Sequence, residues 1–158
     1  MAVLLEKSFP QYPEGETFLQ QAPDFRVVSR HKRKIVSQVA VDFRMIRNGK
    51  NSARVFCLSD VCVHPDFQSR QLGTQMLKWL ESEAQKNGID FILLTSGVQG
   101  FYYKLGYRYK ENIFKWLLIR NGKSMGLLQR RLRSTVMVKK ISQEVWSNGI
   151  IDLAGPIF

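Results

Sequence analysis

The amino-acid sequence predicts an α/β fold of the α+β type, in which helices flank a mixed β-sheet. Apolar and polar residues alternate over Phe25–Ser29 and Lys34–Met45, which is the period of half-buried strands, and a further strand is expected at about Ala53–Val63. An amphipathic helix over about Leu72–Asn87 then leads into a buried strand at Ile89–Thr95. This strand–helix–strand unit is expected to be a right-handed crossover between parallel strands.

Turn signals separate these elements. Asn48-Gly49 is typical of a tight hairpin, and His64-Pro65-Asp66 ends the third strand because proline removes a hydrogen-bond donor. Gly88 follows the long helix where a left-handed residue is needed. The apolar stripe of that helix consists of Leu72, Met76, Leu77, Leu80 and Ala84.

The two ends of the chain give weaker patterns. Residues 2–9 and Glu16–Gln21 predict two short helices, separated by a stretch rich in proline and glycine. After the buried strand, a short helix is expected at Val98–Leu105, and strands are expected at Tyr107–Tyr109, Phe114–Ile119 and Ser134–Ile141, with a turn at Asn121-Gly122. The tail Val145–Phe158 is expected to be irregular but docked. No linker or repeat appears, so residues 1–158 are interpreted as one domain.

The composition favours a globular cytoplasmic protein. Apolar residues make up 44% and charged residues 23% of the chain, no apolar run is long enough to span a bilayer, and no signal peptide is recognised. Cys57 and Cys62 are expected to be free thiols that point to opposite faces of one strand. No Cys/His spacing indicates a metal site.

The formal net charge of +11 favours anionic ligands. Basic residues gather at Arg26–Lys34 and between Lys115 and Lys140. They form either a solvated basic face or a field that attracts a phosphorylated ligand. Binding to nucleic acid is the less favoured interpretation, because no helix-turn-helix or basic aromatic platform is present.

The segment Val61–Leu77 predicts an anion site. A strand ends in a tight loop, and the loop enters a helix whose first N–H groups have no partner within the helix. Gly73 allows a close approach of the backbone, and Arg70 adds a positive charge. A diphosphate is the natural ligand for such a loop.

This segment resembles the acyl-CoA motif of the GNAT acetyltransferases. Their pattern is a valine–x–proline strand end followed by Gln/Arg-x-x-Gly-x-Gly/Ala, and the chain reads Val63-His64-Pro65-Asp66-Phe67-Gln68-Ser69-Arg70-Gln71-Leu72-Gly73. Gln68 and Gly73 match the first and last positions, whereas Gln71 stands where the middle glycine is usual. A slightly different loop is therefore expected.

A second segment, Gly100-Phe101-Tyr102-Tyr103-Lys104-Leu105-Gly106-Tyr107, resembles the family's Phe-Tyr-x-x-x-Gly-Phe motif. The tail from Trp146 to Phe158 is similar to the ends of amino-sugar N-acyltransferase-like members. Together the resemblances imply a GNAT-like, splayed central sheet with acetyl-CoA (coenzyme A) as co-substrate. They imply cofactor contacts from Cys62, Val63, Gln68, Ser69, Arg70, Gln71, Leu72, Gly73 and Thr74.

The resemblance also implies a mechanism of direct transfer to an amine. A backbone N–H near residues 61–63 would stabilise the oxyanion, and Tyr102 is the expected general acid, with Tyr103 as its substitute. Asp60 is the first candidate for the general base, and His64 and Ser96 are alternatives. Acylation of Cys62 is a less favoured route.

Several functions remain open at this level. The acceptor is either a small amine, such as an amino sugar or aminoglycoside, or a protein or peptide amine. A non-catalytic acyl-CoA-binding module of the same fold is the alternative to an enzyme. A homodimer is possible by analogy, and neither a membrane nor a nucleic acid is expected as a partner.

Overall fold

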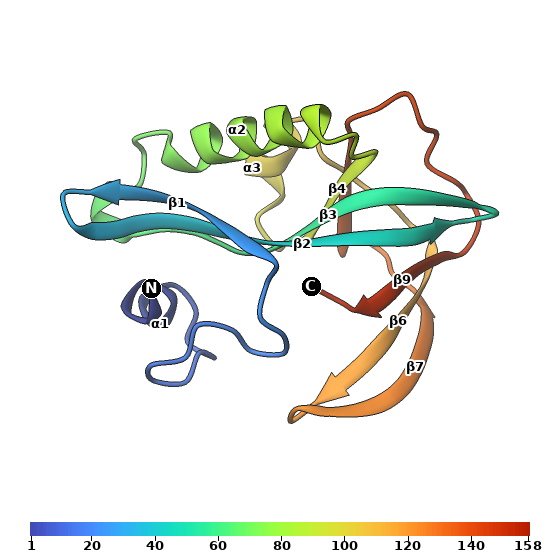
Figure 1. The fold of residues 1–158 in the computed structure, drawn as a ribbon, viewed down its shortest axis with the longest axis horizontal. Coiled ribbons are helices and arrows are strands. Elements are labelled where there is room, and N and C mark those ends of the chain that lie inside the picture. The colour runs from blue at the N-terminus through green and yellow to red at the C-terminus, as the bar shows by residue number, and fades with distance from the viewer.

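The computed structural model describes residues 1–158, in which three helices pack against one nine-stranded sheet (Figure 1). The helices are α1 (Ala2–Ser8), α2 (Leu72–Lys86) and α3 (Gln99–Lys104). The strands are β1 (Phe25–His31), β2 (Lys34–Asn48), β3 (Asn51–Val63), β4 (Phe91–Thr95), β5 (Arg108–Tyr109), β6 (Ile113–Arg120), β7 (Lys123–Arg131), β8 (Val136–Lys140) and β9 (Ile151–Pro156). No helix has the length and apolar character needed to cross a membrane.

The sheet is mixed, as predicted. Its order is β5-β8-β4-β3-β2-β9-β6-β7, and β1 pairs with the first half of β2. β3 and β4 are parallel and joined by α2, which confirms the predicted crossover unit. β6 and β9 are the other parallel pair.

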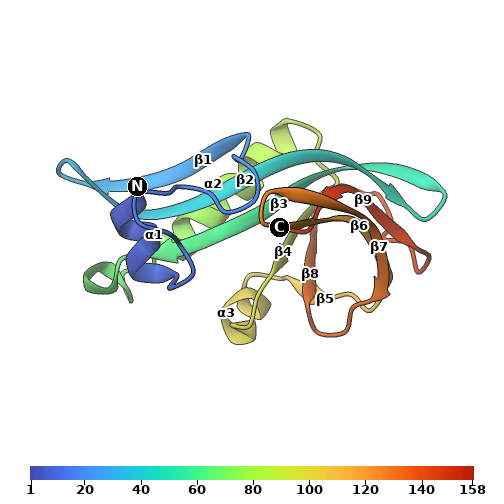
Figure 2. The same ribbon diagram turned by 90° about the horizontal axis from the view of Figure 1, so that it is seen from below.

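Apolar side chains hold helices on both faces of the sheet. α2 buries Met76, Leu77, Leu80 and Ala84 against a cluster that also contains Tyr102 of α3. α1 lies on the opposite face, where Leu4 and Leu5 pack with Tyr12 and Cys62 (Figures 1 and 2). Gly88 adopts the expected left-handed conformation, with φ of +63°, after α2.

The structure differs from the predicted elements at three places. Glu16–Gln21 forms bends rather than a helix, and the Thr17 carbonyl accepts a hydrogen bond from the Arg26 side chain instead of one from a helical N–H. Strand β7 was not predicted. The tail is docked as expected, but its residues Ile151–Pro156 form strand β9 between β2 and β6.

β3 separates from β4 halfway along its length. Their pairing runs from Val55–Phe91 to Leu58–Leu94, whereas β3 continues to Val63. A bulge begins just after this point, because Asp60 and Val61 together face Val39 of β2 and Asp60 has a φ of +51°. The splayed sheet is therefore present, and the bulge lies at the opening.

The bulge also corrects the expectation for the two cysteines. Phe56 and Leu58, on either side of Cys57, pack beneath α2, and so does Val61 beside Cys62. Cys57 and Cys62 therefore both face away from α2, because the extra residue shifts the alternation of side chains by one position. Both thiols are free and buried.

Candidate functional site

The space between the separated ends of β3 and β4 is a cavity of about 750 Å³. The end of β3, the loop before α2, the end of β4 and α3 all contribute to its walls. Its lining contains the predicted cofactor residues Cys62, Val63, Gln68, Ser69, Gln71, Leu72, Gly73 and Thr74, and the predicted catalytic residues Asp60 and Tyr102. Arg70 is the one predicted cofactor residue that does not line it.

The backbone N–H groups of residues 69–74 form the polar end of this cavity. None of these six amides donates a hydrogen bond within the chain, whereas Gln68 and Gln75 on either side donate to Pro65 and Gln71. Unpaired amides at the start of a helix attract anions through their dipoles and hydrogen-bonding capacity. The loop can therefore hold a diphosphate without any side-chain cation.

Two residues of this loop have left-handed backbones. Ser69 and Gln71 both have a φ of +60°, and Gln71 immediately precedes α2. Gln71 occupies the position where the family pattern has its middle glycine, so the glutamine adopts the left-handed conformation that glycine favours.

Gly73 joins the two motifs found in the sequence. A Cβ atom added there would lie 3.3 Å from Cζ of Phe101 and 3.7 Å from Cγ2 of Val63. The start of α2 thus sits directly against α3 and the end of β3. Glycine allows this close packing, because a side chain at this position would press against the Phe101 ring.

Tyr102 faces the cavity from α3. It is 6% exposed, and its ring makes edge contacts with Phe101 and Tyr107. Burial raises the pKa of Tyr102 to about 12, with a smaller electrostatic contribution from the neighbouring Cys62. The phenol consequently keeps its proton at neutral pH and is available as a donor. Tyr103, by contrast, is 38% exposed and lies outside the cavity lining.

Asp60 lies at the bulge and is held by three partners. The Tyr12 hydroxyl donates to Oδ2 of Asp60 at 2.6 Å, the Arg26 guanidinium lies 3.9 Å from the same oxygen, and the Gln38 amide donates to the Asp60 carbonyl at 2.7 Å. Burial raises the pKa of Asp60, although the Tyr12 hydrogen bond and the Arg26 charge oppose this shift. Burial also raises the pKa of Tyr12, so the shared proton stays on the phenol.

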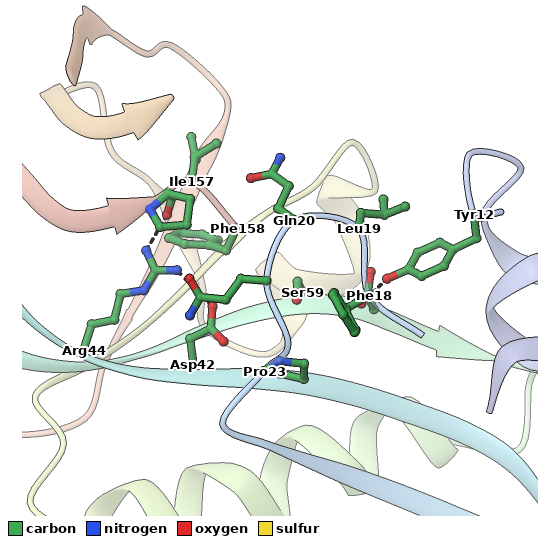
Figure 3. Close-up of a pocket in the computed structure, with 13 residues that line it drawn as sticks. Tyr12, Phe18, Leu19, Gln20, Pro23, Asp42, Arg44, Ser59, Ile157 and Phe158 are labelled. Atoms are coloured by element: carbon green, nitrogen blue, oxygen red, sulfur yellow. Dashed lines mark hydrogen bonds and ion pairs between the residues drawn. The ribbon is translucent and has the colours of Figure 1, made fainter. Parts of the chain in front are cut away.

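A smaller cavity of about 120 Å³ lies on the side of β3 away from the α2 helix (Figure 3). The segment between α1 and β1 covers it with Phe18, Leu19 and Pro23, and Arg44 and Tyr12 lie at its two ends (Figure 3). Arg44 hydrogen-bonds Asp42 at 2.9 Å and also donates to the Pro156 carbonyl.

The two cavities share one wall. Ser59 and Asp60 line both of them, so the two cavities adjoin at the bulge of β3. Asp60 carries the only side-chain carboxylate common to both linings.

The other candidates from the sequence are placed less favourably. His64 accepts from the backbone N–H of Asp66 at 3.3 Å, which is the role of a turn residue, and it does not line the cavity. Ser96 does line it, but its hydroxyl accepts from the Val98 N–H at 2.9 Å. Burial raises the pKa of Cys62, which keeps the thiol protonated and a poor nucleophile.

Tyr12 and Arg26 were not predicted as site residues. Tyr12 lies 48 positions before Asp60, in a stretch with no regular pattern, and Arg26 is one of many basic residues. Neither residue belongs to a sequence motif that would mark it as a site residue. Tyr12 reaches the bulge only because residues 9–24 cross the sheet.

A family model described as "Acetyltransferase (GNAT) domain" matches residues 25–109. That range contains β1 to β5, α2 and α3, and hence all of the larger cavity except Phe9. No curated protein matches the sequence.

One solved structure shares the fold at low sequence identity, and two others are similar to parts of this chain. The GNAT family N-acetyltransferase YhbS from Escherichia coli, in complex with CoA, is 11% identical with a TM-score of 0.60, over 83% of this chain and 67% of that chain. A GCN5-related N-acetyltransferase from Kribbella flavida is 18% identical with a TM-score of 0.49, over 52% of this chain and 22% of that chain. The PaiA N-acetyltransferase from Thermoplasma acidophilum, in complex with coenzyme A, is 18% identical with a TM-score of 0.49, over 73% and 59% of the two chains.

Proposed function

Because the chain belongs to the GNAT acetyltransferase family, we propose that it is an enzyme that transfers an acyl group, most simply acetyl, from acyl-CoA directly to a primary amine. The observation that carries this proposal is the shared wall at Ser59 and Asp60. A thioester in the larger cavity and an amine in the smaller one would meet there, which direct transfer requires.

The larger cavity fits coenzyme A in shape and chemistry. The six unpaired amides of residues 69–74 suit its diphosphate, and the apolar gap between β3 and β4 suits its pantetheine arm. Cys62 and Val63 would contact that arm through the backbone edge of β3 that β4 leaves unpaired. The coenzyme A bound to YhbS supports the same choice of ligand for this chain.

Asp60, Tyr102 and the β3 backbone would divide the chemistry between them. The thioester supplies the acyl group and a thiolate leaving group. Asp60 accepts the proton of the amine, directly or through water, so that the nitrogen lone pair attacks the carbonyl carbon. A backbone N–H of residues 61–63 stabilises the negative charge on the carbonyl oxygen, and the Tyr102 phenol protonates the departing sulfur.

The small cavity favours a compact acceptor with a single amine over a polycation. Both of its carboxylates are already paired with arginine, Asp42 with Arg44 at 2.9 Å and Asp60 with Arg26 at 3.9 Å. The net charge of +11 also repels polycations at long range. A compact amino sugar or the amine of a peptide terminus fits these limits better than an aminoglycoside.

A Tyr102→Phe variant tests the assignment of the general acid. Loss of a positioned acid is expected to lower kcat by about 10²–10⁴-fold, with the dissociation constant for acetyl-CoA unchanged, because the phenol acts only on the departing sulfur. Acetyl-CoA consumption across amino sugars, amino acids, peptides and polyamines would first identify the acceptor.

The neighbouring Tyr103→Phe is the matched control and should keep full activity. Equal activity of the two variants would remove Tyr102 from the mechanism. Binding of acetyl-CoA without turnover of any amine would favour the non-catalytic module, and absence of binding would reject both functions. A ligand at 100 times its dissociation constant adds about 2.7 kcal/mol to stability, so thermal denaturation reports binding clearly.

Two further assignments accompany this proposal. The nine strands form one sheet, which supports a single acyltransferase domain over residues 1–158.

A homodimer through the free edge of β7 is the weaker assignment. Antiparallel pairing centred on Leu127 would place Lys123 opposite Arg131, and like charges in that register repel. Sedimentation velocity at low and high salt would detect such a dimer.

A further inference from the structure

Five basic side chains near the loop before α2 have no acidic partner. Arg30, Lys32, Arg33 and Lys34 are exposed at the turn between β1 and β2, and Arg70 is exposed in the loop itself. None of them forms an ion pair or a side-chain hydrogen bond within the chain. Asp66, which belongs to the same loop as Arg70, lies 3.7 Å from His64.

Phe67 connects the β1–β2 turn and Arg70 to the larger cavity. The His31 ring lies 5.1 Å from the Phe67 ring, and the Arg70 guanidinium lies 5.0 Å above the same ring. Phe67 itself lines the cavity directly beside the unpaired amides of residues 69–74. Figures 1 and 2 both place the β1–β2 turn and the loop before α2 at the same end of the sheet.

We propose that the basic cluster of the β1–β2 turn and Arg70 recognises the 3′-phosphate of coenzyme A. This assignment rests on the proposed function, because it takes the diphosphate to lie on the loop amides. One ribose separates the 3′-phosphate from the diphosphate, and the contact between the tilted rings of His31 and Phe67 brings the basic turn beside the loop that carries those amides. A phosphate with up to two negative charges meets there the uncompensated positive charge that it requires.

The cluster therefore determines specificity rather than catalysis. It discriminates coenzyme A from molecules that carry the same thioester and diphosphate without the 3′-phosphate. Several partly exposed charges acting together make the preference sensitive to salt.

The matched ligand for the test is dephospho-coenzyme A, which lacks only the 3′-phosphate. Isothermal titration of the full chain is expected to give about tenfold weaker binding of dephospho-coenzyme A than of coenzyme A at low salt, and a smaller ratio at 0.5 M salt. The double variant Lys32→Glu/Arg33→Glu should bind coenzyme A only about as tightly as the unaltered protein binds dephospho-coenzyme A. The affinity for dephospho-coenzyme A should change little, which also shows that the variant is folded.

The double variant Arg120→Glu/Lys123→Glu is the matched control. It makes the same change of charge at the turn between β6 and β7 and should keep the preference for the 3′-phosphate. Equal binding of both ligands to the unaltered protein would overturn the 3′-phosphate assignment but not the proposed function. An unchanged preference for coenzyme A in the Lys32→Glu/Arg33→Glu variant would have the same meaning. Failure of both ligands to bind would overturn the proposed function together with the 3′-phosphate assignment.

Discussion

Gln71 adopts a backbone conformation that most residues avoid. Its φ is +60°, and its neighbour Ser69 has the same value. A left-handed backbone costs a residue with a Cβ atom roughly 1–2 kcal/mol relative to glycine. The anion loop therefore keeps its shape without its usual glycine, at some expense of stability.

Replacement of Gln71 by glycine should stabilise the protein by up to about 1 kcal/mol. Relief of the left-handed strain exceeds the extra flexibility that glycine gives the unfolded chain, which offsets about 0.5–1 kcal/mol. Urea denaturation measures this change directly. Gln68→Gly is the control: its φ is −65°, so the same substitution should destabilise. A loss of stability in Gln71→Gly would mean that the glutamine side chain makes a compensating contact.

The hydrogen bond between Tyr12 and Asp60 affects the pKa of the Asp60 carboxyl group. The Tyr12 hydrogen bond favours the ionised carboxylate and so lowers the pKa of Asp60, whereas burial raises it. Because Asp60 is the proposed general base, activity is expected to be lost as the pH falls through its raised pKa.

In a Tyr12→Phe variant, the acidic limb of the profile of kcat/KM against pH should move to higher pH. Burial raises the pKa of Asp60 and the Tyr12 hydrogen bond lowers it, so removal of the hydrogen bond lets the pKa rise further. At pH values well above the limb, kcat/KM should approach that of the unaltered enzyme. A uniform loss at all pH values would indicate that Tyr12 has only a structural role, and an unmoved limb would remove Asp60 as the base.

At the scale of elements, two buried asparagines attach the tail to the sheet. The Asn112 amide donates to the carbonyls of Ser147 and Gly149 at 2.9 and 2.7 Å, and its oxygen accepts from the Trp146 indole at 2.9 Å. Asn48 makes two more bonds, to the Val145 carbonyl and the Ser147 N–H, both at 2.8 Å. The turn that leads into β9 is fixed in this way.

Asn112→Ala should lower the free energy of unfolding by about 3 kcal/mol or more. It removes three hydrogen bonds at a site 6% exposed and leaves their partners unpaired. Asn51→Ala, at an exposed position, should change stability by less than about 0.5 kcal/mol. A small effect at Asn112, measured by urea denaturation, would show that water replaces the lost amide.

The elements that the sequence predicted well are those with a strong local pattern. The stripe of α2, the buried strand after Gly88 and the two Asn-Gly turns all appear where periodicity and turn chemistry indicated them. β7 escaped prediction because all nine of its residues are exposed and only its pairing with β6 makes it a strand. β9 escaped because its partners are distant parts of the chain.

The same contrast holds for the site. The anion loop and Tyr102 belong to continuous motifs, so their positions followed from the sequence. The bulge at Asp60 depends on the register between β2 and β3, and the smaller cavity depends on residues 9–24 folding across the sheet. Such long-range geometry leaves no local trace in composition or periodicity.

At the scale of the whole molecule, charge and cavities act together. The net charge of +11 attracts a polyanionic coenzyme from a distance, and the basic cluster at the β1–β2 turn lies at the end where that coenzyme would enter. The acceptor would approach from the opposite face of the sheet, so the two ligands need not pass one another.

The place of β9 in the sheet also matters for biosynthesis. This strand is the sole bridge between β2 and β6, yet it is the last strand to leave the ribosome. Until residues 151–156 emerge, the nascent chain exposes two open strand edges on separate half-sheets. Both edges are liable to pair with other chains during that interval, so this topology is most exposed to aggregation before residues 151–156 join the sheet.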